Sequence, residues 1–363
     1  MVATLAYLTA MLGGSLLLHP SMVSPLWPGC ALLVSVLLLA PRKSWPILIA
    51  AGFASFVLHD LQTGWPIRSI VLIILADAVE VITAAFCLSY SFEAVPRLNS
   101  LRSLAKYSFF AVVLAPLAGA LVGAVAGADS YWTNWRIYLF SEALAYLTLL
   151  PAILGWVDKR SAWAQKSGAY YLEAAALLAA VALSGYLNLV APGRSSSPAL
   201  FFSLVPLLLW AAFRFGSTGV STSMILIAFL SIWGATRGRG PFLESEPLKN
   251  VLSLQLFLLF TAAPFMVFAA LVEERKHGEE ELREGEERLR LAVQAGRMYA
   301  FERDLASDVI VRADGTEIFS IGWTSQCAIP VVNLSPESTQ TTARRMSRPK
   351  LGTLPTILLI RLV

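Results

Sequence analysis

The chain has 363 residues, of which 56% are hydrophobic and 14% are charged, and its mean hydropathy is +0.65. Soluble domains carry roughly a quarter charged residues, so this composition excludes a soluble enzyme over most of the length. The net charge of +4 does not indicate a nucleic-acid partner, because the basic residues lie scattered between apolar blocks that favour a lipid bilayer.

Apolar blocks alternate with short polar loops from residue 1 to about residue 272. Blocks near 20 residues can cross roughly 30 Å of hydrocarbon, and the shorter ones can be re-entrant. We therefore predict an all-α polytopic membrane bundle of about eight to ten transmembrane helices. The predicted spans are Val2–Leu18, Trp27–Ala40, Trp45–Leu58, Ser69–Tyr90, Leu104–Ala126, Arg136–Trp156, Gly168–Ala191, Pro198–Phe213, Gly216–Gly234 and Asn250–Val272.

The basic residues of the loops predict the orientation. Arg42 and Lys43 lie in the first loop assigned to the inside, and Arg275 and Lys276 follow the last span. Because Lys and Arg are enriched in cytoplasmic loops, we predict that both termini are cytoplasmic and that the protein is a multi-pass component of a bacterial inner membrane.

Carboxylates inside apolar blocks are the candidate functional residues. Asp77 and Glu80 are three residues apart on one helical face, and Glu142 lies in a separate block. Buried carboxylates are costly in lipid, so they face the bundle interior. Two interpretations stay open: a ligand or proton site that includes Arg214, or polar packing in which the carboxylates bond neighbouring helices or Arg214. The cysteines have no zinc-binding spacing, so no metal or cofactor is expected.

The segment PLLLWAAFRFGSTG, followed by GRGPF, predicts two helices joined by a tight turn. Glycine permits positive φ and close helix approach. The residues expected to shape this turn and the opposite loop are Gly216, Gly219, Gly238, Gly240 and Pro241.

This segment resembles the membrane-associated sensor domain family known as MASE, type one. The blocks LWPGCALLVSVLLLAPRKSWPIL and WRIYLFSEALAYLTLLPAIL are also similar to it. The resemblance implies a membrane sensory input module of about eight helices, covering residues 1–272, that senses an unknown small ligand. Family members generally feed histidine kinases or diguanylate cyclases.

Residues 273–297 form a highly charged segment that we predict to be a linker helix. Leu282 and Leu289 stand one heptad apart, which favours a signalling coiled coil in a homodimer. The alternative is a solvated connector, because Gly278 and Gly285 interrupt the pattern.

Residues 298–325 alternate like two short strands and resemble the opening of a PAS domain. The remaining residues, 326–363, have no clean periodicity. We predict an incomplete PAS segment followed by an atypical tail, which a frameshift near residues 323–330 would explain.

No kinase, cyclase or nucleotide-binding motif is present, so no catalytic residue is predicted. The first hypothesis is the input module of a two-component sensor histidine kinase. The alternatives are the input module of a diguanylate cyclase and a multi-span transporter-like protein, although a transporter predicts an internal repeat that the sequence lacks.

Overall fold

The computed structural model describes residues 2–16, 24–127, 130–160, 166–191, 202–242, 247–296, 299–304, 309–312 and 356–360. The chain divides into two compact units, Met1–Lys276 and His277–Val363. Of the atypical tail predicted at residues 326–363, the structure describes only positions 356–360.

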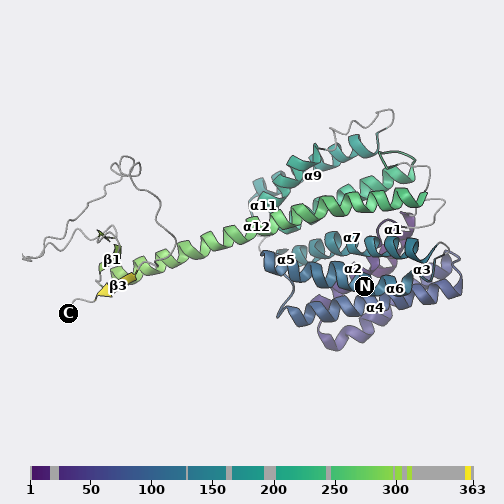
Figure 1. Cartoon of the computed structure of the whole chain (residues 1–363), viewed down its shortest axis with the longest axis horizontal. Coiled ribbons are helices and arrows are strands. Elements are labelled where there is room, and N and C mark those ends of the chain that lie inside the picture. The colour runs from purple at the N-terminus through teal and green to yellow at the C-terminus, as the bar shows by residue number, and fades with distance from the viewer. Residues whose placement is uncertain are drawn as a thin grey trace, which may run out of the picture. The chain divides into compact units, whose positions relative to one another are not determined.

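The first unit is helical throughout its described parts, and its helices lie side by side in a bundle (Figure 1). Its elements are α1 (Val2–Ser15), α2 (Pro28–Leu39), the 3₁₀ turn η1 (Arg42–Ser44), α3 (Trp45–Gln62), α4 (Ile67–Ser91), α5 (Leu101–Tyr107), the π-helix η2 (Ser108–Leu114), α6 (Ala115–Gly123), α7 (Tyr131–Asp158), α9 (Gly168–Leu189), α11 (Leu204–Thr236) and α12 (Pro247–Gly296).

Among the described residues, 7 helices are long and apolar enough to cross a membrane. This number is below the predicted eight to ten for two reasons. The first two predicted spans form α1 and α2, of 14 and 12 residues. At 1.5 Å per residue these helices are only about 21 and 18 Å long, which is short of the hydrocarbon thickness. The other difference is that α11 counts as one helix although it includes most of the predicted span Pro198–Phe213 and all of Gly216–Gly234, which stay separate because the chain reverses at Gly216.

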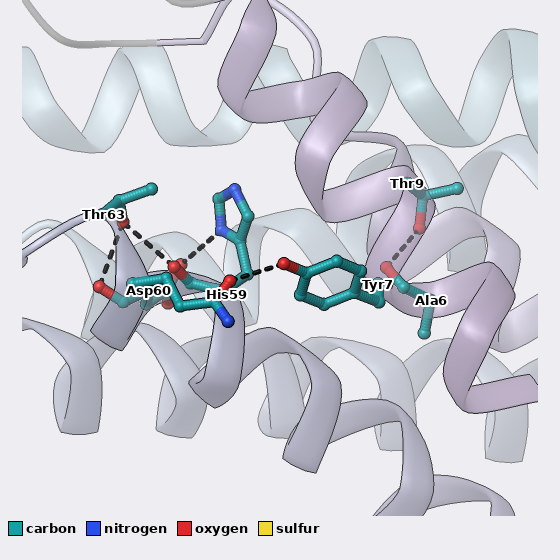
Figure 2. Close-up of polar contacts among 7 residues, drawn as sticks. Ala6, Tyr7, Thr9, His59, Asp60 and Thr63 are labelled. Atoms are coloured by element: carbon teal, nitrogen blue, oxygen red, sulfur yellow. Dashed lines mark hydrogen bonds and ion pairs between the residues drawn. The ribbon is translucent and has the colours of Figure 1, made fainter.

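The short helix α1 packs against α3 and is hydrogen-bonded to it. The Tyr7 hydroxyl donates a hydrogen bond to Gln62 Oε1, and Figure 2 shows Tyr7 reaching toward the end of α3 where His59 and Asp60 lie. His59 Nδ1 and Asp60 Oδ1 are 3.1 Å apart. The side chain of Thr63 bonds the last carbonyls of α3, so this end of the helix is well capped.

Helix α11 reverses its direction at Gly216, whose φ is 66° and whose ψ is −154°. The chain on either side of α11 meets the same end of α9: Ser203 Oγ lies 3.2 Å from Asn188 Nδ2, and Gly234 packs against the Leu189 carbonyl. Arg214, next to the reversal, pairs with Glu173 near the opposite end of α9. The two halves of α11 are therefore antiparallel.

The glycines of these turns have different conformations. Gly238 and Gly240 have positive φ values of 65° and 96°, and Pro241 follows directly. Gly219 is helical and does not have a positive φ. Its lack of a side chain lets Phe215 and the Ala211 carbonyl oxygen lie close to it, because a Cβ there would meet Phe215 and lie 3.0 Å from that oxygen.

Helix α7 is the most deeply buried span, and it contacts α2, α6 and α11. Helix α12 buries one face at intervals of three or four residues, as an amphipathic helix does. The buried positions of that face include Val251, Leu254, Leu258, Ala262, Met266 and Ala269.

The second unit contains strands β1 (Tyr299–Asp304), β2 (Val309–Arg312) and β3 (Thr356–Ile360) in the order β2-β1-β3. Both pairings are antiparallel, with Phe301 opposite Arg312 on one side and opposite Leu358 on the other. Strands β1 and β2 lie in the segment expected to resemble a PAS domain. Residues 313–325 of that segment lie outside the described residues.

Candidate functional site

The buried carboxylates of two helices meet in the middle of the bundle. Asp77 and Glu80 come from α4 and Glu142 from α7, with exposures of 2%, 0% and 2%, and we call these residues the acidic cluster. Tyr138 lies one turn before Glu142, and its hydroxyl donates a 2.7 Å hydrogen bond to Asp77 Oδ1. The two helices are therefore joined directly at the cluster.

Two glycines of α6 allow this helix to pack closely against α4 and α7 at the acidic cluster. Gly119 and Gly123 are four residues apart and so lie on one face, in the pattern of small residues that brings membrane helices together. A Cβ at Gly119 would lie 2.7 Å from Glu80 Oε2, and one at Gly123 would lie 2.9 Å from the Tyr138 ring. The α6 backbone is thus one wall of the cluster.

A thiol from a third helix completes the group. Cys30 of α2 is fully buried, and its Sγ and one oxygen from each of Glu80 and Glu142 all lie within 4.8 Å of one another. Thiol and carboxylate groups are metal ligands, so these residues could hold a metal ion. The sequence expectation of no metal site considered the spacing of cysteines only, and this arrangement combines one cysteine with carboxylates from distant segments.

Several polar atoms of this group have no hydrogen-bond partner among the residues that the structure describes. They are Asp77 Oδ2, Glu80 Oε1, Glu80 Oε2, Glu142 Oε2 and the Tyr146 hydroxyl. A buried carboxylate without a partner is costly in a protein interior and in a membrane. The acidic cluster must therefore be neutralised, either by protons or by a bound cation.

A cavity of about 190 Å³ reaches the cluster at Asp77 and Glu142. His59 and Asp60 of α3 also line it, together with Trp65 and Gly127 from the connections before α4 and α7. The cavity therefore lies toward the end of the bundle where α7 begins. Its lining includes three carboxylates, Asp60, Asp77 and Glu142, which favours a cationic occupant.

Arg214, which the sequence grouped with the carboxylates, lies apart from the acidic cluster in this structure. Its Nε lies 2.7 Å from Glu173 Oε2, and its guanidinium lies 5.8 Å from the centre of the Tyr170 ring. The physical reason is its position next to the reversal at Gly216, at one end of the bundle, whereas the cluster lies well inside the spans.

A second polar group holds the last turn of α12 in the first unit. Glu273 lies 3.2 Å from Lys159 Nζ and accepts a 3.1 Å hydrogen bond from Ser217 Oγ. Glu274 accepts a 2.9 Å bond from the Leu101 backbone N–H. We call Glu273, Glu274, Lys159, Ser217 and the Leu101 amide the exit clamp. It ties α12 to α5, to the end of α7 and to the second half of α11.

A family model described as MASE1 matches residues 1–276, which is more than half of the chain. The chain belongs to the MASE1 family. MASE1 is a membrane sensory input domain found in signalling proteins such as histidine kinases and diguanylate cyclases. No curated protein and no solved structure matches the chain significantly.

The MASE1 match and the first compact unit both end at Lys276, beyond the predicted boundary at residue 272. The exit clamp therefore belongs to the MASE1 domain itself. Together with the apolar helices, the match makes this chain a multi-pass membrane protein.

Proposed function

We propose that this MASE1 domain receives a signal at the acidic cluster and passes it through the end of α12 to a histidine-kinase output of the two-component type. The observation that supports this best is the exit clamp, because it connects the helix that leaves the domain to three other parts of the bundle. A change in their packing is transmitted to α12 at that point.

Helix α7 offers the path between the two groups. It carries Glu142 of the acidic cluster, and Lys159 of the exit clamp follows its last residue. Pro151 lies between them, and proline removes a backbone donor and bends a helix at its position. We infer that the domain has two packings, and that occupation or neutralisation of the cluster favours one of them.

The strands β1 and β2 support a PAS-type segment as the next module, since they have the short antiparallel arrangement expected there. Leu282 and Leu289 are 65% and 40% exposed on the charged part of α12. Their heptad spacing supports a second copy of this chain as the partner that covers them.

The proposed orientation places residues 277–296 in the cytoplasm of a bacterial cell. We expect a cysteine introduced by Leu282→Cys to react with a membrane-impermeant maleimide only after spheroplasts are permeabilised. Cys87 and Cys327 are replaced by serine in this experiment, and Glu244→Cys, in a loop predicted to be outside, should react in intact spheroplasts. Labelling of Leu282→Cys before permeabilisation would overturn the proposed direction of signalling.

The same variant tests the homodimer. Oxidation in the membrane should cross-link Leu282→Cys into a band of twice the mass. Leu291→Cys is the matched control, because that side chain is exposed but lies off the heptad face. Equal cross-linking at both positions would indicate collision and not a specific helix pair.

A further inference from the structure

Three side-chain atoms at the centre of the bundle, one sulfur and two carboxylate oxygens, are of the types that bind metal ions. Cys30 Sγ from α2, one Glu80 oxygen from α4 and one Glu142 oxygen from α7 converge within 4.8 Å of one another. Tetrahedral Zn²⁺ holds sulfur at about 2.3 Å and oxygen at about 2.0 Å, so its ligands are roughly 3.5 Å apart. Binding requires the two glutamate side chains to adjust so that the donor atoms reach that spacing.

The unpartnered atoms provide an independent observation in favour of a cation. Glu80 is fully buried, and neither of its carboxylate oxygens has a hydrogen-bond partner among the described residues. Glu142 Oε2 and the Tyr146 hydroxyl, from the same helix, also lack partners. A bound divalent ion supplies what these oxygens lack and offsets the negative charge that would otherwise be buried.

The cavity beside the acidic cluster provides a path by which a metal ion can reach these donor atoms. Glu142 belongs both to the converging donors and to the lining of the cavity of about 190 Å³. Asp60, His59 and Asp77 lie along the same cavity, and imidazole and carboxylate groups can transfer a metal ion toward the centre.

We propose that Cys30, Glu80 and Glu142 bind a divalent transition-metal ion of borderline softness, with Zn²⁺ as the best fit. A thiolate selects against Mg²⁺ and Ca²⁺, and a site with one sulfur and two carboxylates suits Zn²⁺ and its close neighbours. Three protein ligands leave a fourth position for water. Binding displaces the thiol proton, and any proton held by the Glu80 and Glu142 carboxyl groups, to solvent. This proposal rests on the proposed sensory function, because it names the ligand class of the same site.

The test is a titration of the full chain, purified in detergent, with Co²⁺ and then Zn²⁺. Cys327→Ser is the background, so that Cys30 and Cys87 are the remaining thiols. We expect a thiolate-to-Co²⁺ charge-transfer absorption that saturates at about one ion per chain and disappears when Zn²⁺ replaces Co²⁺. Zn²⁺, but not Mg²⁺, should also raise the melting temperature.

Variants assign the ligands. Cys30→Ser should abolish the absorption, whereas Cys87→Ser, which removes the half-buried thiol of α4, should retain it. Glu80→Gln and Glu142→Gln should each weaken Co²⁺ binding by about 10-fold or more, since even outer-shell changes commonly cost that much. Size-exclusion profiles verify that each variant is folded.

Absence of the absorption in the Cys327→Ser chain would show that no thiolate of this chain binds Co²⁺, and its persistence in Cys30→Ser would place the ion at another thiol; either outcome rules out a metal site at Cys30. That result would overturn the metal site alone. The sensory function would still be judged separately, by whether Glu142→Gln alters the exit clamp.

Discussion

Replacing Gly216 with alanine should lower the melting temperature of the full chain in detergent much more than replacing Gly238 with alanine. Both glycines have a positive φ, 66° and 65°, but the ψ of −154° places Gly216 in a region that is essentially restricted to glycine, where alanine costs about 1–3 kcal/mol of backbone strain. A Cβ at Gly216 would also collide with the Glu273 carboxylate, whereas one at Gly238 would have nothing within 4 Å.

The difference between the two variants combines the loss of the exit clamp with the greater backbone strain at Gly216. Displacing Glu273 breaks its contacts with Lys159 and Ser217, and hydrogen bonds to charged groups contribute about 1.5–3 kcal/mol. Gly216→Ala is therefore expected to cost about 2.5–6 kcal/mol in total. Equal losses in the two variants would mean that the contact between Gly216 and Glu273 does not hold α12.

A second large effect is expected at Gly119. In Gly119→Ala the new methyl group would lie 2.7 Å from Glu80 Oε2 and 3.2 Å from the Ala76 carbonyl oxygen. The second neighbour is backbone and cannot rotate away, so α4 and α6 must separate. Overpacking of this kind costs about 1–3 kcal/mol, and the melting temperature should fall accordingly.

Gly168→Ala is the matched control for this substitution, because a Cβ at the start of α9 meets nothing within 4 Å. Its melting temperature should be almost unchanged. If Gly119→Ala melted like the parent chain, α4 and α6 would not be packed as closely as the structure has them, and the position of Glu80 would be in question.

The sequence was sufficient for the class of fold and for part of the site. Hydropathy predicted the membrane bundle, and the three-residue spacing of Asp77 and Glu80 placed them on one face. Tyr138, Glu142 and Tyr146 follow one another at intervals of four residues, so their common face was also readable from the sequence. That signal was missed because tyrosine is common in apolar helices.

Other features depend on which helices become neighbours, and no local pattern carries that information. Cys30 looks like any small buried residue until α2 packs against α4 and α7. Arg214 is close in sequence to the spans, but the reversal at Gly216 fixes it beside Glu173. The exit clamp joins Lys159 to Glu273, which are far apart in the chain, so charge alone could not pair them.

The most direct test of the account asks whether the acidic cluster communicates with the exit clamp. Hydrogen–deuterium exchange of the full chain in lipid nanodiscs should be compared between the parent and Glu142→Gln, with Glu93→Gln, which changes an exposed carboxylate, as the control. We predict faster exchange at Glu273–Lys276 in Glu142→Gln only. Exchange that changes around residue 142 but stays the same at Glu273–Lys276 would contradict the account.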